Sequence, residues 1–243
     1  METPINTLFL LQSLDWKITP WNSDSLDIWK DLSKIKWLKD WLMQYYKLEQ
    51  ETDLHSLNTG RVMAKIWMND KNYNFEIYPE VSFIIVDNSH LNEIWVEKMA
   101  SKLKKLYIVT KNKNHPAFKI KQKFDNIEIL FYEDEIDFID MMRNLKSLYS
   151  IDKITIQSWW TMNSIFFRNN LIHKISIVIA PVIIWWKDTT SLVDWESLTS
   201  VDELYKLKVL NLKRVENLWN SYLHLEYDVL RNTEIESWFI VPN

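Results

Sequence analysis

Short apolar runs alternate along the chain with longer segments in which apolar residues recur every three or four positions. The runs predict strands at Thr7–Gln12, Arg61–Ile66, Ser82–Val86, Leu106–Val109, Ile127–Phe131, Ile151–Gln157 and Ile175–Ile184. The longer segments predict helices at Leu38–Glu49, Leu91–Lys104, Ile136–Leu148 and Thr161–Asn169. Strands that alternate with helices indicate an α/β fold with a mostly parallel central sheet, flanked by helices on both faces.

Two segments near the C-terminus show strand-like alternation between apolar and polar residues. Tyr205–Glu216 and Ser221–Leu230 therefore predict strands. The short connection Asn217–Asn220 predicts that the two strands form an antiparallel hairpin. No internal repeat, low-complexity tract or clear linker interrupts the chain, so we expect a single domain over residues 1–243.

The composition excludes several kinds of site and partner. A formal net charge of −4 argues against a nucleic-acid binder, which needs a basic face. The chain has no cysteine and its five histidines show no metal-binding spacing, so we expect no metal. No apolar run reaches the roughly 18 residues that span a bilayer, and the apolar N-terminal run lacks the basic flank of a signal peptide. We therefore expect a cytoplasmic protein with no membrane partner.

The composition has one anomaly, because the chain has 14 tryptophans and 1 glycine. Average usage would give about 17 glycines in a chain of this length. Many of the tryptophans fall at turns, where a positive φ or a close backbone approach favours glycine; these are Trp16, Trp159, Trp160, Trp185, Trp186, Trp195 and Trp219. Our hypothesis is that these positions are glycine in the living protein, through a UGA codon that the source organism reads as glycine. The alternative, a carbohydrate-binding surface, needs tryptophans along one strand face, which adjacent pairs at turns do not provide.

The segment Ile154–Ser197 holds the strongest constellation of motifs. With glycine at Trp159 and Trp160, a strand would pass through Ser-Gly-Gly-Thr into a helix. A glycine pair lets the backbone approach a pyrophosphate, and the helix N-terminus points N–H groups and a positive dipole end at that anion. A tight turn between strand and helix without any ligand is the alternative. Literal indoles would fill this cradle, so we expect the chain as written to lose cofactor binding and to carry backbone strain at these turns.

This segment resembles the riboflavin-pathway reductase family, which comprises the C-terminal reductase domain of the bifunctional deaminase–reductase and the stand-alone diaminopyrimidinone ribosylphosphate reductases. The family's motifs occur in the same order and spacing at Ser158–Met162, Leu171–Lys174, Ala180–Pro181 and Trp185–Trp186. A second match lies near the N-terminus, where Ser13–Thr19 is similar to the family's Ser-Leu-Asp-Gly-Lys-Ile. The resemblance is strong over Ile151–Val229 and Leu8–Thr19 and weak between them.

The resemblance implies a dihydrofolate-reductase-like fold with NADPH as the hydride donor. It implies a small heterocyclic substrate, namely the pyrimidine-type riboflavin precursor 5-amino-6-(5-phosphoribosylamino)uracil or diaminopyrimidinone ribosylphosphate. A dihydrofolate or pterin-type reductase is one alternative, and a non-catalytic nucleotide-binding protein of the same fold is another. Family members often dimerise, and the sequence leaves a homodimer open.

The resemblance also implies roles for individual residues. The cofactor phosphates would lie against Ser158, Trp159, Trp160, Thr161 and Met162. Asp15 would be the catalytic carboxyl at the substrate pocket, although an aspartate that only caps a turn is the alternative. Ser13 and Lys17 would contact the substrate, and a solvated lysine is equally consistent with the sequence. Thr110 and Lys111, with Lys113 nearby, would lie at the adenosine 2′-phosphate, where cations favour NADPH over NADH.

The chain departs from the family pattern at several positions. Gln157-Ser158 stands where the family has Glu-Gly, and His173-Lys174 stands where it has Asp-Glu. The family's middle motif is absent, and Thr52–Ile66 stands in its place, which puts the identity of the substrate in doubt. The motifs of a zinc deaminase domain are missing as well, so the sequence indicates a reductase alone.

Overall fold

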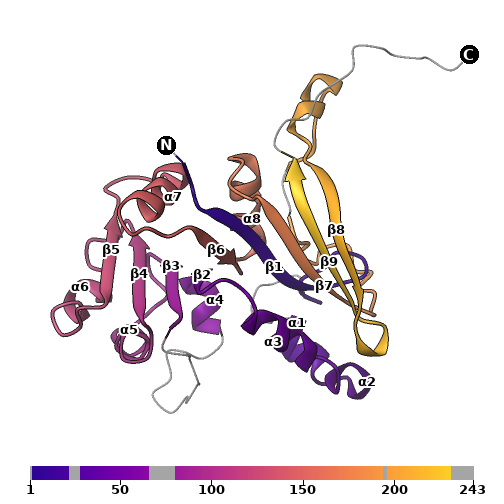
Figure 1. The fold of residues 1–243 in the computed structure, drawn as a ribbon, viewed down its shortest axis with the longest axis horizontal. Coiled ribbons are helices and arrows are strands. Elements are labelled where there is room, and N and C mark those ends of the chain that lie inside the picture. The colour runs from indigo at the N-terminus through magenta and orange to yellow at the C-terminus, as the bar shows by residue number, and fades with distance from the viewer. Residues whose placement is uncertain (1, 22–27, 66–79, 194–195, 231–243) are drawn as a thin grey trace, which may run out of the picture.

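The computed structural model describes residues 2–21, 28–65, 80–193 and 196–230. Nine strands of this part join one sheet in the order β5-β4-β3-β2-β6-β1-β7-β9-β8 (Figure 1). The strands are β1 (Ile5–Ser13), β2 (His55–Thr59), β3 (Ser82–Val86), β4 (Lys105–Thr110), β5 (Ile127–Phe131), β6 (Lys153–Ile156), β7 (Lys174–Ala180), β8 (Val209–Asn217) and β9 (Leu223–Leu230). Strands β1 to β7 pair with one another in parallel. The strand β9 pairs antiparallel with both β7 and β8.

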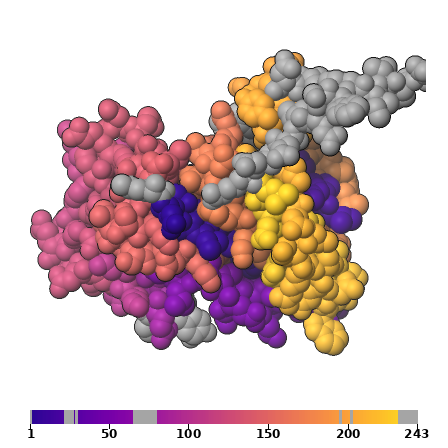
Figure 2. Space-filling model, turned by 45° about the horizontal axis from the view of Figure 1, so that its top comes forward, coloured from indigo at the N-terminus to yellow at the C-terminus, as the bar shows by residue number. Residues whose placement is uncertain are grey.

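Helices cover both faces of the sheet (Figure 1). They are α1 (Ile28–Leu32), α2 (Lys36–Lys39), α3 (Met43–Gln50), α4 (Gly60–Lys65), α5 (Glu93–Ala100), α6 (Pro116–Ile120), α7 (Phe138–Ser147) and α8 (Trp160–Arg168), with 3-10 turns at Val201–Lys206 and Trp219–Ser221. In the space-filling view the C-terminal hairpin (yellow) forms one end of the molecule, and the first strand (indigo) lies near its middle (Figure 2). The predicted α/β fold with a C-terminal hairpin is therefore confirmed.

The core divides into clusters that follow the two faces of the sheet. On one face α7 and α8 pack Met141, Leu145 and Phe166 against inward-pointing isoleucines of the strands, such as Ile84 and Ile156. The other face carries two clusters, one under α5 and α6 and the other under α1 to α3. Because side chains alternate between the faces of a strand, each central strand contributes to both layers.

Two predicted elements of the N-terminal half are wrong in type or extent. The predicted strand Arg61–Ile66 is a helix, α4, as far as it is described, and the strand β2 ends just before it at Thr59. Arg, Met, Ala and Lys are good helix formers, and the Thr59 hydroxyl accepts a hydrogen bond from the N–H of Val62 in the first turn. The predicted helix Leu38–Glu49 is divided into α2 and α3.

Differences also occur near the C-terminal strands. The predicted strand Ile175–Ile184 ends at Ala180, because Pro181 has no N–H to donate to a neighbouring strand. The predicted strand Tyr205–Glu216 begins only at Val209, after a 3-10 turn. Sequence patterns also missed the five-residue helices α1 and α6, which are too short to show a helical period.

Candidate functional site

The chain leaves the neighbouring strands β1 and β6 toward opposite faces of the sheet. After β6 the chain enters α8, which packs Phe166 into the cluster on one face. After β1 it enters α1, which packs Ile28 and Leu32 into a cluster on the other face. In open α/β sheets ligands bind outside the carboxyl ends of the strands at such a topological switch point. We define the switch point here as Gln12–Asp15 and Gln157–Trp160, and it is our candidate functional site.

A short hydrogen-bonded network holds Asp15 at the end of β1. Its Oδ1 accepts hydrogen bonds from the Ser13 hydroxyl at 2.6 Å and from the Ile184 backbone N–H at 2.9 Å. Burial raises the pKa of Asp15, but the hydrogen bonds from Ile184, Ser13 and its own backbone N–H, together with the charge of Lys17, outweigh it, so the pKa lies below its ordinary value of 3.8. The structure therefore presents an ionised carboxylate at the switch point, tied to the loop after β7.

Lys17 lies beside this network, but its side chain points to a partner within the chain. The ammonium donates a hydrogen bond to the Thr189 carbonyl at 2.7 Å. The Lys17 N–H also donates to the Ser13 hydroxyl at 3.0 Å, and the residue forms an isolated bridge with Ser191. The structure thus brings Ser13, Asp15 and Lys17 together, and the Lys17 side chain closes the loop at Thr189.

The turn from β6 into α8 presents backbone groups rather than side chains. Trp159 is the N-cap of α8, with extended backbone at φ −81 and ψ 160, and no side chain caps the helix. The Ser158 hydroxyl is buried and donates to the Asn163 Oδ1 at 2.7 Å, while the Asn163 amide donates to the Leu192 carbonyl at 2.9 Å. Thr161 is exposed and Met162 packs against the core. A ligand phosphate at this turn would therefore meet the N–H groups of the first helical turn.

The tryptophan positions agree only in part with the glycine hypothesis. Trp16 has φ 65, in the left-handed region that favours glycine. Trp159 and Trp160 do not have a positive φ, so the backbone strain predicted at that turn is wrong, because the N-cap conformation is extended. Trp195 lies outside the described residues.

The remaining described tryptophans differ strongly in burial. Trp185 and Trp186 stack on each other at 4.8 Å and are 73% and 53% exposed, and Trp219 is 72% exposed. Their backbone φ is not positive, so of the two reasons for glycine, a positive φ does not apply at these three positions. Large exposed indoles are nonetheless unusual outside binding surfaces. Trp95 is different, because it is fully buried on the core face of α5.

Thr110 ends β4 and Lys111 follows it, and the strands β3 and β2 separate β4 from β6. The buried Thr110 hydroxyl donates to the Asn88 Oδ1 at 3.2 Å, and the Lys111 backbone N–H donates to the same oxygen at 2.8 Å. The Lys111 ammonium forms an ion pair with Glu135. These two predicted residues therefore lie at the same edge as the switch point, but not beside it.

A buried carboxylate that the sequence patterns did not indicate lies at this edge. Asp87 follows β3 and accepts hydrogen bonds from His115 Nε2 at 3.1 Å and from the backbone N–H groups of His90 and Leu91. Burial raises the pKa of Asp87, but the His115 and backbone hydrogen bonds outweigh it and lower the pKa to about 2. Its position directly after an apolar strand was the signal that could have identified it.

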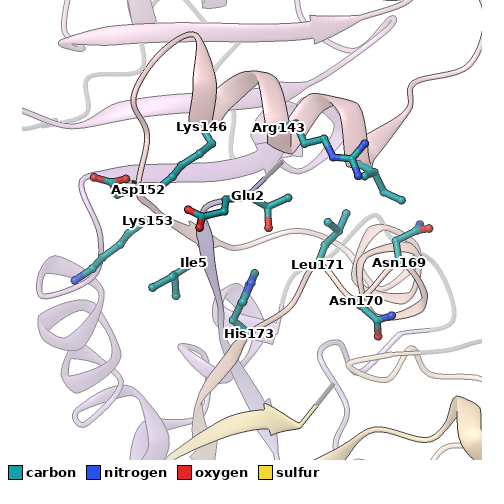
Figure 3. A pocket seen from close by; sticks show the side chains of 12 residues that line it. Glu2, Ile5, Arg143, Lys146, Asp152, Lys153, Asn169, Asn170, Leu171 and His173 are labelled. Carbon is teal, nitrogen blue, oxygen red and sulfur yellow. Dashed lines mark hydrogen bonds and ion pairs between the residues drawn. The ribbon is translucent and has the colours of Figure 1, made fainter. Parts of the chain in front are cut away.

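A cavity of about 710 Å³ lies at the opposite edge of the sheet (Figure 3). Its lining includes Ile5 and Lys153, which begin β1 and β6, and Arg143 of α7. Lys146 and Asp152 in this lining form an ion pair. Because ligands of parallel sheets bind at the carboxyl ends of the strands, we do not assign the site to this cavity.

Within the described ranges, no three His, Asp or Glu side chains come together in a way that could hold a metal ion. No helix in the same part of the chain is long and apolar enough to cross a membrane.

The sequence matches no protein-family model. The structure is similar to RibD of Acinetobacter baumannii, with a TM-score of 0.60 and 12% identity over 94% of this chain; the chain spans only 58% of RibD's length. It is similar to the riboflavin biosynthesis reductase Rib7 of Saccharomyces cerevisiae, with a TM-score of 0.54, 13% identity and coverage of 94% and 90% of the two chains. It is also similar to a pyrimidine reductase-like protein of Corynebacterium diphtheriae, with a TM-score of 0.59, 13% identity and coverage of 94% and 93%. The chain therefore has the dihydrofolate-reductase-like α/β fold of the riboflavin-biosynthesis reductases.

Proposed function

We propose that the protein is an NADPH-dependent reductase of a pyrimidine-type riboflavin precursor, either 5-amino-6-(5-phosphoribosylamino)uracil or diaminopyrimidinone ribosylphosphate. The observation that carries this proposal is the switch point itself. There the carboxylate of Asp15, held by Ser13 and Ile184, lies one strand away from the start of α8. A carboxylate for a polar heterocycle and a helix N-terminus for a phosphate are the two recognition elements that such a reaction needs.

The cofactor phosphates fit the start of α8, where the first-turn N–H groups have no capping side chain. The half-buried indoles of Trp159 and Trp160 pack against the core at this turn, and glycine at both positions would open it further. The adenosine end would extend toward Thr110 and Lys111. Strands lie about 4.8 Å apart, so β4 is about 14 Å from β6, a distance that a dinucleotide spans.

NADPH, when bound, supplies the hydride, and the protein supplies binding and orientation. The hydrogen bonds from Ser13 and Ile184 fix the position of the Asp15 carboxylate and lower its pKa, and the group is ionised at neutral pH. We therefore assign Asp15 to accept hydrogen bonds from N–H groups of the substrate and to stabilise positive charge on its reacting C=N group. Lys17 supports this arrangement by holding the loop at Thr189.

The test is NADPH oxidation with a panel of pyrimidine and pterin substrates. It should use the chain as written and a variant with glycine at Trp16, Trp159, Trp160, Trp185 and Trp186. We expect the glycine variant to oxidise NADPH with a pyrimidine precursor and to gain thermal stability from NADPH. Turnover of dihydrofolate alone would establish the dihydrofolate-type alternative. NADPH binding without turnover of any substrate would establish the non-catalytic alternative.

A further inference from the structure

Gln12 carries a buried side-chain amide that nothing in the described part of the chain satisfies. The residue is fully buried near the end of β1, and neither its Nε2 nor its Oε1 has a hydrogen-bond partner there. Asn6 and Asn58 each leave one buried oxygen unpaired, but Gln12 leaves a donor and an acceptor unpaired together. Most buried polar groups in folded proteins are paired, so an amide with two unpaired atoms needs an explanation.

The position of Gln12 places this amide at the switch point. Leu8 and Leu10 of β1 belong to the α8 face of the sheet and Phe9 and Leu11 to the opposite face, so alternation puts Gln12 on the α8 face. β1 pairs with β6 only as far as Leu8. Gln12 therefore lies beyond the end of β6, where the chain turns into α8.

The polar neighbours of Gln12 along the chain and on the turn are already paired with other groups. Ser13 bonds to Asp15, and Ser158 bonds to Asn163, which in turn bonds to Leu192. Leaving an amide unpaired in such surroundings destabilises the folded protein. A group that lowers stability without a partner in the chain is expected where a ligand supplies the partner.

We propose that Gln12 pairs through both amide atoms with the amide edge of a heterocycle bound at the switch point. The ligand carbonyl would accept a hydrogen bond from Nε2, and the adjacent ligand N–H would donate to Oε1. A pyrimidinone ring and the carboxamide of nicotinamide both present this edge. The inference rests on the proposed function and identifies Gln12 as the residue that recognises the heterocycle by hydrogen bonds.

The test compares Gln12→Met with the control variant Leu10→Met, which changes the same face of the same strand two residues earlier. Both substitutions are made in whichever protein oxidises NADPH in the substrate panel, the chain as written or the glycine variant. Three ligands are titrated: NADPH, its 3-acetylpyridine analogue, in which an acetyl group replaces the carboxamide, and 5,6-diaminouracil. Melting temperatures are measured without ligand.

We expect Gln12→Met to raise the melting temperature, because it removes an unpaired buried amide. We also expect it to lower the affinity for one of the ligands at least tenfold. If nicotinamide is the partner, the acetylpyridine analogue binds the wild type more weakly than NADPH does, and the variant no longer distinguishes the two. If the pyrimidine is the partner, only the affinity for diaminouracil falls. Leu10→Met should change neither affinity.

Affinities and KM values that are unchanged in Gln12→Met, in an otherwise active enzyme, would overturn this inference and leave the proposed function standing. A wild type that neither binds NADPH nor turns over would overturn both. If Gln12→Met packs poorly and lowers the melting temperature, Gln12→Leu repeats the comparison. Weakened binding in either folded variant supports the inference, and unchanged binding in both overturns it.

Discussion

Gly60 packs directly against Asp87. A Cβ at Gly60 would lie 2.2 Å from the Asp87 Oδ1, although the backbone of Gly60 does not have a positive φ. Asp87 cannot move away easily, because His115 and two backbone N–H groups hold its carboxylate. Gly60, the one glycine in the sequence, is therefore required by the close approach between the start of α4 and the residue that follows β3.

Gly60→Ala should destabilise the protein, because the added methyl group overlaps a carboxylate that is fixed on its other sides. Overpacking of this kind costs about 1–3 kcal/mol. Urea unfolding measures the loss, with Ser89→Ala as an exposed control on the neighbouring turn that should change stability by less than about 0.5 kcal/mol. If Gly60→Ala is as stable as the wild type, the Asp87 carboxylate can move away from the added methyl group at little cost.

The ionised form of Asp87 should stabilise the fold at neutral pH. Its pKa is about 2 in the folded protein and about 3.8 when unfolded, so the unfolded chain takes up the proton first as the pH falls. The stabilisation is complete above about pH 4 and is lost as the pH falls toward 2, and it amounts to about 2 kcal/mol. Asp87→Asn should lose this amount at neutral pH.

Unfolding measured at a series of pH values checks this prediction. The difference in stability between Asp87→Asn and the wild type should shrink below about pH 4. A difference that does not change with pH would mean that the loss comes from packing, not from charge. A double-mutant cycle of His115→Ala and Asp87→Asn measures how much of the stabilisation by Asp87 depends on its interaction with His115.

The sequence predicted most of the buried parallel strands, because they are short β-branched runs with clear ends, but it predicted no strand at β2. Ser82–Val86 and Ile127–Phe131 match β3 and β5 at both ends. The error at Arg61–Ile66 arose because a short apolar segment is compatible with either type of element. There the boundary depends on the cap at Thr59, not on hydrophobicity.

The site was less predictable, because its hydrogen bonds join residues that are far apart in the sequence. One partner of Asp15 is Ile184, 169 positions away, and one partner of Asp87 is His115, 28 positions away. Local patterns identified Ser13 and Asp15 through a family motif. They gave no signal for Gln12, whose importance depends on which groups the folded chain leaves unpaired.

Trp16→Gly should stabilise the protein, because glycine adopts φ 65 without the steric conflict that a Cβ creates. The left-handed conformation costs a residue with a Cβ about 1–2 kcal/mol. Trp219→Gly is the matched control, since Trp219 is also exposed at a turn but does not have a positive φ. Thermal or urea unfolding should show a gain for Trp16→Gly and none for Trp219→Gly. Equal effects would remove the backbone argument for glycine at Trp16.

The native protein should be lighter than the sequence as written, if UGA codons place glycine at the tryptophan positions. Intact-mass measurement of protein purified from the source organism should then fall below 29.5 kDa. Peptide mapping should find glycine at Trp16, where the backbone favours it. A native mass that equals the calculated one would refute the recoding hypothesis and establish the exposed indoles as real.

Asp15→Asn should lower kcat of the proposed reductase about 100-fold or more, because the neutral amide cannot stabilise positive charge on the substrate as the carboxylate does. NADPH affinity should change little, since the cofactor phosphates are assigned to the start of α8 on the next strand. Ser13→Ala removes one of the two hydrogen bonds to Asp15 and should have a smaller effect in the same direction.

Asp152→Asn is the control, because Asp152 lines the cavity at the opposite edge of the sheet and should leave kcat unchanged. Steady-state kinetics of the four proteins, with NADPH titrations beside them, decide the matter. Full activity in Asp15→Asn would assign Asp15 to capping the turn between β1 and the Ile184 loop.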